Sequence, residues 1–192
     1  MNIENNPLIQ PSAASLARAS LGLTAIALGL CGFLYSAAAA GLGQALFPDQ
    51  ANGSMIVEND RILGSSLVAQ PFAQAKYFHP RPSAANYDPM AMAGSNLART
   101  NPELHKAVEE RLKRIAAQEQ IAEERIPADL VTASGSGIDP EISAASALIQ
   151  VRRVAEARRL PEQAVLDLVQ QQTIQPDWGV LGQARINVLE LN

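Results

Sequence analysis

The sequence predicts an α+β protein, with a single N-terminal transmembrane helix followed by a small extracytoplasmic domain of three main helices and a small sheet. Three observations predict this class. Residues 19–48 carry no charge, residues 48–102 are rich in Pro, Gly, Ser and Asn around short β-like runs, and residues 101–171 contain stretches with helical periodicity. After the apolar segment about 150 residues remain, which is enough for one domain with a buried core.

The apolar segment at residues 19–42 predicts a membrane span, because about 20 apolar residues cross a hydrocarbon core of about 30 Å. A cleaved signal peptide is the alternative, since Arg18 precedes the run and the small residues at 36–40 resemble a cleavage site. However, the region before the run holds only one base, and the run exceeds the usual length of about 7–15 residues. We therefore expect a retained anchor.

Flanking charges predict the orientation of this anchor. Arg18 precedes the segment, whereas three acids come before the first base on the other side. Bases favour the cytoplasmic side of a membrane span. The sequence thus predicts a cytoplasmic tail at 1–18, a transmembrane helix at 19–42 and an extracytoplasmic domain at 43–192, in the cell inner (plasma) membrane.

Small residues recur along one face of the expected anchor helix, at spacings of four, three, four and four positions. Such a face lets a second transmembrane helix approach closely, and packing then drives association. A high Ala and Gly content by itself also produces spaced matches. We expect a partner helix to pack on the face formed by Ala25, Gly29, Gly32, Ser36 and Ala40.

Composition excludes several classes of function. Beyond residue 42 the chain has 14 bases and 18 acids, which is not the basic surface of a nucleic-acid-binding domain. The only cysteine, Cys31, lies inside the apolar segment, so no internal disulfide is possible. His79 and His105 are far apart and lack metal-ligand spacing, so we expect no metal site.

The first third of the domain is expected to contain little regular structure. Residues 55–58 and 62–68 resemble short strands around a turn at Asn59-Asp60. Residues 76–87 contain two prolines and predict an ordered, extended loop.

Three helices follow. Asn101-Pro102-Glu103 combines a capping side chain, a proline at the first helical position and an acid in the first turn. A second helix is expected to open at Asp139-Pro140 or at Ser143, and a third at Pro161. We expect strands at 128–132 and 185–192.

The loop from Ser134 to Asp139 is the most distinctive local feature. Gly and Ser residues between a strand and a helix are typical of phosphate-binding loops, but this loop lacks the lysine of a Walker motif and ends on the carboxylate of Asp139. The alternative is structural, with short polar side chains accepting hydrogen bonds from backbone N–H groups. Ser134 and Ser136 lack the surroundings of a catalytic serine.

Arg81 lies between two prolines and close to Tyr77, Phe78 and Tyr87. It is either part of a recognition arm or an arginine that stacks on aromatic rings and fixes an extended loop. The sequence leaves both interpretations open.

Taken together, these motifs resemble one family, the C subunit of the bacterial high-affinity potassium-transporting P-type ATPase, the Kdp complex. The resemblance runs from the anchor to the C-terminus, and its most specific part is the run from Asp129 to Pro140. It is carried by Gly64-Ser65, Gln70, Phe72, Tyr77-Phe78, Arg81–Ala84, Tyr87, Gly94–Leu97, Asn101-Pro102, Asp129–Pro140, Ile142-Ser143, Gln150-Val151, Arg153–Ala155, Ala157-Arg158, Arg185, Asn187–Leu189 and Leu191-Asn192.

The resemblance implies a non-catalytic accessory subunit of an ATP-driven high-affinity potassium uptake pump. It would assemble with a channel-like potassium-binding subunit and an ATP-hydrolysing P-type subunit. The family is also credited with raising the pump's affinity for ATP as a catalytic chaperone, so ATP enters as a ligand only by this attribution. The alternative is a membrane-anchored or secreted enzyme, or a nucleotide-binding regulator, that uses the loop at 134–139.

We expect no catalytic residue in this chain. The candidate contact residues of the domain, which belong to the motifs of the resemblance, are Tyr77, Phe78, Arg81, Asn96, Asp129, Ser134, Ser136 and Asp139.

Overall fold

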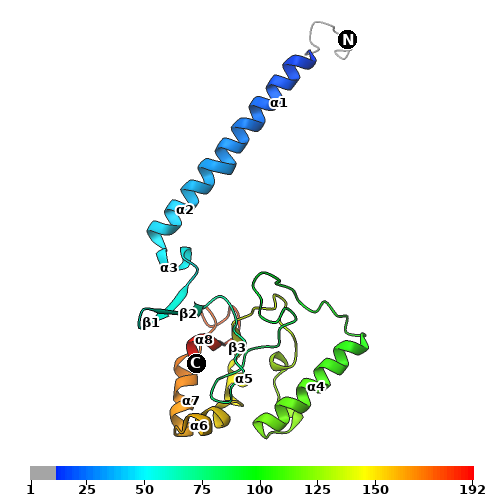
Figure 1. Ribbon diagram of the computed structural model, residues 1–192, viewed down its shortest axis with the longest axis vertical. Helices are drawn as coiled ribbons and strands as arrows, with labels where there is room; N and C mark the ends of the chain where they lie inside the picture. The colour runs from blue at the N-terminus through cyan, green and yellow to red at the C-terminus, as the bar shows by residue number, and fades with distance from the viewer. Residues whose placement is uncertain (1–11) are drawn as a thin grey trace. The chain divides into compact units, whose positions relative to one another are not determined.

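The computed structural model describes residues 12–192. It divides into two units, one up to Gly53 and one from Ser54 to Asn192. The chain is drawn in Figure 1, coloured from blue at the N-terminus to red at the C-terminus. Each unit is described by itself.

The first unit is a continuous apolar helix, Ala13–Leu46, of 34 residues, with mean hydropathy 1.8 over an 18-residue stretch. It consists of α1 (Ala13–Ala27), a π-helical stretch η2 (Leu28–Leu34) and α2 (Tyr35–Leu46), followed by the short α3 (Pro48–Ala51). The side chain of Ser12 caps α1 by accepting a hydrogen bond from the N–H of Ser15. The helix is long and apolar enough to cross a membrane, and it extends beyond both ends of the expected span at 19–42.

The second unit begins with the antiparallel hairpin of β1 (Met55–Glu58) and β2 (Arg61–Ser65). Asn59 and Asp60 form its turn with φ values of 49° and 60°. Asn and Asp tolerate this left-handed conformation better than other side chains, and it matches the twist of the strands. The predicted hairpin and its turn are confirmed. Residues 76–87 form no helix or strand, as expected.

The helix α4 (Pro102–Glu119) begins where the sequence predicted. The side chain of Asn101 accepts a hydrogen bond from the N–H of Glu103, and Pro102 occupies the first helical position. Two short 3₁₀ turns follow, η3 (Glu123–Arg125) and η4 (Ala128–Leu130). In Figure 1 α4 lies on the side of this unit away from α7, and its C-terminal end approaches α6.

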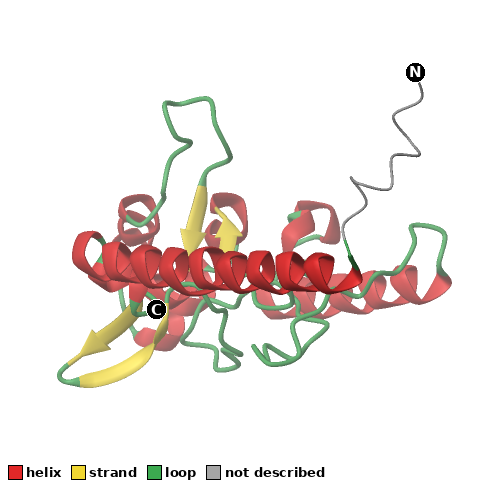
Figure 2. Ribbon diagram, turned by 90° about the horizontal axis from the view of Figure 1, so that it is seen from above, coloured by secondary structure: helices red, strands yellow, loops and turns green. Residues whose placement is uncertain are grey.

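The remaining elements are β3 (Glu141–Ser143), α5 (Ala144–Leu148), α6 (Val151–Arg158), α7 (Glu162–Gln171), β4 (Arg185–Asn187) and α8 (Val188–Leu191). The strands β3 and β4 pair antiparallel, with Ile142 opposite Ile186. Figure 2 shows the two strand pairs in yellow, separate from each other. The α+β class with one N-terminal apolar helix is confirmed, with two small sheets in place of one.

The core of the second unit collects apolar side chains from most of its elements. Phe78 contributes the largest fully buried side chain, at 1% exposure. The rest of the core is Leu130, Ile142, Ala147, Val151, Val154, Ala155, Val165, Val169, Ile186, Val188 and Leu191.

Two local predictions were wrong, those of the strands at 128–132 and 185–192. The expected strand at 128–132 is the 3₁₀ turn η4, because the N–H groups of Leu130 and Val131 bond back to the carbonyls of Pro127 and Ala128. Both Leu130 and Val131 are buried, so the run lacks the alternation of a strand.

Of the two expected starts of the second helix, Ser143 is confirmed, because its side chain caps α5 by accepting from the N–H of Ser146. The helix is interrupted at 149–150, between α5 and α6. The closing strand ends at Asn187, because the Asn187 side chain accepts from the N–H groups of Leu189 and Glu190 and starts α8.

Candidate functional site

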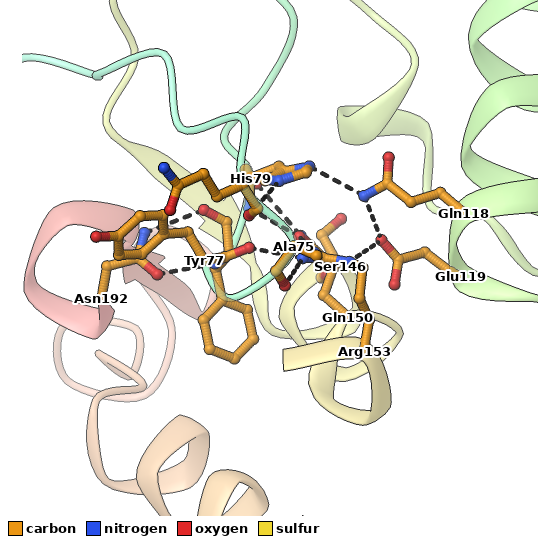
Figure 3. Close-up of polar contacts among 11 residues, drawn as sticks. Ala75, Tyr77, His79, Gln118, Glu119, Ser146, Gln150, Arg153 and Asn192 are labelled. Carbon is orange, nitrogen blue, oxygen red and sulfur yellow. Dashed lines mark hydrogen bonds and ion pairs between the residues drawn. The ribbon is translucent and has the colours of Figure 1, made fainter. Parts of the chain in front are cut away.

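The segment at residues 75–79, here called the strap, is held against α6 by Arg153 (Figure 3). The guanidinium donates to the backbone carbonyls of Ala75 and Tyr77, the latter at 2.8 Å. It also donates to the Oε1 atoms of Gln150 at 2.7 Å and Glu119 at 2.8 Å. One side chain therefore joins the strap, α6 and the C-terminal end of α4.

Two amide side chains bind consecutive residues of the strap through both of their backbone groups. Gln150 Oε1 accepts from the N–H of His79 at 2.7 Å, and Gln150 Nε2 donates to the carbonyl of His79 at 3.2 Å. Asn192 does the same to Phe78, at 2.8 and 3.0 Å. Gln150 is only 1% exposed, so its side chain takes the place of water as the hydrogen-bond partner of the His79 backbone.

The imidazole of His79 lies between two further partners. Gln118 Nε2 donates to His79 Nδ1 at 3.1 Å, which leaves His79 Nε2 to carry the proton and donate to the carbonyl of Gln74 at 3.2 Å. Burial lowers the pKa of His79 below its usual value of 6.5, and the positive charge of Arg153 lowers it further. The geometry and the charges both favour the neutral ring.

Glu119 completes what we call the Arg153 cluster, which comprises His79, Gln118, Glu119, Gln150 and Arg153. Its Oε1 atom accepts from Arg153 and, at 3.0 Å, from Gln118. Its Oε2 atom is buried and has no hydrogen-bond partner among the described residues. Burial raises the pKa of Glu119, against the opposing effect of Arg153.

A cavity of about 350 Å³ opens beside the Arg153 cluster. Arg114 lines it without a carboxylate partner among the described residues, and the charge of Glu119 is balanced by Arg153. The wall therefore has an excess positive charge, which disfavours a potassium ion. The lining residues are Pro71, Phe72, Ala73, His79, Pro80, Pro82, Tyr87, Arg114, Ile115, Gln118, Glu119, Leu130 and Gln150.

The pKa of His79 predicts how stability depends on pH. The pKa of His79 is lower in the folded domain than in the unfolded chain, so the unfolded chain takes up a proton at a higher pH. The stability that depends on the neutral ring is therefore fully present above pH 6.5 and is lost as the pH falls below it. Protonated Nδ1 would also face the N–H of Gln118, donor against donor. Glu119, with a raised pKa, has the opposite sign, because it takes up a proton more readily in the folded state.

We expect His79→Gln to flatten the fall in unfolding free energy between pH 7 and pH 5.5. Urea titrations of the full chain in mild detergent, followed by circular dichroism, measure it. His105→Gln, at an exposed histidine of α4, is the matched control. An unchanged slope in His79→Gln would show that the ring is not protonated differently in the two states.

The Ser134–Asp139 loop forms hydrogen bonds mainly with itself and with residues 81–83. Ser134 Oγ accepts from the N–H of Gly137 at 2.8 Å, Ser136 Oγ from Ile138 at 3.2 Å, and Asp139 Oδ1 from Glu141 at 3.0 Å. These N–H groups are therefore not aimed at a phosphate.

Gly137 has φ +77°, and a Cβ there would lie 2.7 Å from both Ala85 Cβ and the carbonyl of Ala93. Only glycine fits this close approach without strain. The sequence interpretation of a short polar loop that satisfies its own backbone agrees with these contacts.

The structure brings some of the other expected residues together. Arg81 donates to Asp139 at 2.8 Å, and both line a second cavity of about 480 Å³ with Asp129. Asp129 accepts from the N–H and hydroxyl of Ser143 and from the hydroxyl of Ser146.

The remaining expected residues lie elsewhere. Phe78 is in the core. Tyr77 packs on Phe72, and the cations of Lys76 and Arg158 both lie over its ring. Asn96 is exposed, with φ 51°, and belongs to neither cavity. Tyr87 contacts Arg81 through a hydrogen bond to its backbone, because the Tyr87 hydroxyl donates to the Arg81 carbonyl at 2.9 Å.

The small-residue face of the first unit, Ala25, Gly29, Gly32, Ser36 and Ala40, is exposed along its whole length. Gly29 and Gly32 fall in η2, where the helix is wider than an α-helix. The packing of this face on a partner helix stays a prediction.

Sequence reasoning singled out none of the Arg153 cluster as site residues. Gln150 and Arg153 lie on either side of the buried Val151 in a predicted helix. An amide and a cation beside a buried apolar residue could have indicated a polar site inside the domain. Gln118 and Glu119 lie at the end of α4 and carry no such signal, because their partners in the rest of the cluster are 34 or more residues away in the chain.

Comparison with known proteins decides the family. The family model described as "K+-transporting ATPase, c chain" matches residues 17–192. This chain belongs to the KdpC family of potassium-transporting ATPase subunits. It is thus an accessory subunit of the Kdp potassium uptake complex, and the suspected resemblance is confirmed.

Relatives from distant bacteria agree over nearly the whole chain. Three of them carry the name "Potassium-transporting ATPase KdpC subunit". The one from Xanthomonas campestris pv. campestris (strain B100) is 54% identical over 91% of this chain and 84% of its own length. The one from Shewanella putrefaciens is 50% identical over 91% and 86%, and the one from Acidobacterium capsulatum is 47% identical over 91% and 94%.

Proposed function

We propose that this KdpC chain is a single-pass, non-catalytic subunit whose folded domain works outside the cytoplasm, beside the ion-conducting part of the pump. The observation that carries the proposal is the combination of one spanning-length apolar helix with a separate folded unit in a chain of this family. Residues 1–18 form the cytoplasmic tail, 19–42 the part within the bilayer, and 43–192 the extracytoplasmic domain. ATP hydrolysis belongs to another subunit.

The orientation rests on charge. Arg18 precedes the apolar helix, and Asp49, Glu58 and Asp60 follow it before Arg61. Bases near a span are retained on the cytoplasmic side. This arrangement favours a domain on the outer face of the inner membrane.

We expect protease added to intact spheroplasts to digest the domain and to leave the cytoplasmic tail intact. Immunodetection of a tag at each end of the chain measures both. Protection of the domain, or a mature N-terminus near Ala40, would contradict the proposal and favour the opposite orientation or a cleaved signal peptide.

The partners are a channel-like potassium-binding subunit and an ATP-hydrolysing P-type subunit of the same complex. The small-residue face at Gly29 and Gly32 supports helix packing with one of them, because small side chains allow two backbones to approach closely in lipid. A Cβ at either glycine meets no atom of this chain within 4 Å, so a larger side chain leaves the chain's own fold intact.

Gly29→Leu combined with Gly32→Leu should reduce the amount of this subunit that co-purifies with the complex in mild detergent, because leucine pushes the helices apart. Leu28→Ile is the matched control, since it changes shape within the same segment without adding bulk. If the double variant co-purifies at the wild-type level, the small-residue face does not pack on a partner helix and only reflects the high Ala and Gly content of the segment.

The loop at 134–139 has a structural role in this proposal. Two of its N–H groups, those of Gly137 and Ile138, bond to the loop's own serine side chains. Asp139 accepts from the N–H of Glu141, and its carboxylate would repel a phosphate. Any effect of this subunit on the pump's affinity for ATP would then pass through contacts between subunits. This is why we place no nucleotide in the loop.

A further inference from the structure

The loop at residues 173–184, here called the Trp178 loop, exposes large apolar side chains to solvent. Trp178 is 89% exposed, Val180 78% and Leu181 52%. Asp177 is the only charged residue of the loop. An uncharged tip of this kind is unusual on a surface that only water contacts.

The Trp178 loop is a formed turn. At its base Ile174 and Arg185 exchange two backbone hydrogen bonds of 2.9 and 3.0 Å, and near its tip Asp177 and Leu181 exchange two of 2.9 Å. Trp178 has φ +52°, in the left-handed region that large side chains seldom adopt. The backbone therefore holds the indole outward at a cost in strain, which is typical of functional contacts.

The chemistry of the tip fits the boundary between lipid headgroups and acyl chains. Tryptophan is enriched there because its ring is apolar while its N–H remains a hydrogen-bond donor. The loop contains no Lys or Arg, so its attraction to a bilayer does not depend on anionic lipids.

The length of the chain keeps the second unit near a membrane. The apolar helix ends at Leu46, and the second unit begins at Ser54. The few residues between them reach at most about 3.5 Å each when fully extended, roughly 25–30 Å in all. An anchored chain thus presents the Trp178 loop to lipid at high effective concentration, and a weak contact suffices.

We propose that the Trp178 loop inserts its tip into the interfacial region of the bilayer that its own anchor crosses. Trp178, Val180 and Leu181 contact lipid, and zwitterionic lipid is sufficient. The inference rests on the proposed membrane anchoring and adds a second point of contact to it.

The test uses the full chain in nanodiscs of phosphatidylcholine brominated high on the acyl chain. Trp178 is the only tryptophan of the chain, so its fluorescence reports on this loop alone. We expect emission shifted to the blue and strongly quenched, relative to unbrominated nanodiscs, with weaker quenching by bromines near the chain end. Val180→Ser combined with Leu181→Ser should reduce the quenching.

Trp178→Phe combined with Glu110→Trp is the control. It places the lone tryptophan on the exposed face of α4, where the Glu110 side chain is 67% exposed, and its emission should not respond to brominated lipid. If Trp178 is not quenched in chains that are incorporated in nanodiscs, the inference is overturned. A loop that is covered by protein instead of lipid would give this same unquenched result. Extraction of the chain by alkaline carbonate would instead overturn the anchoring itself.

Discussion

Arg153→Met should destabilise the domain by about 3–5 kcal/mol, because removing one partner of a buried ion pair leaves the other charge uncompensated. The Arg153 and Glu119 side chains are 9% and 2% exposed, and the N–O distance between them is 2.8 Å. The same substitution removes the donors to two strap carbonyls. Urea unfolding of the full chain in mild detergent, followed by circular dichroism, measures the loss from the domain.

A double-mutant cycle separates the charge from the packing. Glu119→Gln with Arg153→Met should recover part of the loss, because no buried charge then remains unpaired. Arg153→Lys should cause an intermediate loss of stability. Lysine keeps the positive charge but lacks the planar guanidinium with which Arg153 reaches four acceptors. If Arg153→Met costs less than about 1 kcal/mol, as a surface pair would, the cluster does not hold the strap in place.

The parts of the fold that local chemistry determines could be predicted from the sequence. The apolar helix, the Asn59-Asp60 turn of the hairpin and the start of α4 at Asn101 each depend on neighbouring residues, and each is confirmed. The run at 128–132 could not be predicted, because its Leu130 and Val131 are both buried by other parts of the domain. Tertiary packing overrides β-propensity at such a place.

The candidate site was less predictable because its contacts are remote in sequence. Phe78 is bound by Asn192 across 114 positions, and His79 by Gln150 across 71. No local pattern indicates that this segment will meet a C-terminal asparagine. The Ser134–Asp139 loop was accessible to sequence reasoning because three of its hydrogen bonds span only two or three residues.

The strap also predicts a large effect for Phe78→Ala, a loss of about 3–5 kcal/mol from the lost burial and the cavity left behind. Phe78 is 1% exposed in the domain core, and both of its backbone groups are bound by Asn192. Urea unfolding of the full chain measures the loss, and hydrogen exchange at the amides of residues 78 and 79 should speed up with it. Tyr77→Phe is the neighbouring control: it keeps the ring on Phe72 and should change stability by less than about 0.5 kcal/mol. Unchanged exchange at these two amides in Phe78→Ala would mean that Asn192 and Gln150 hold the strap without the core beneath it.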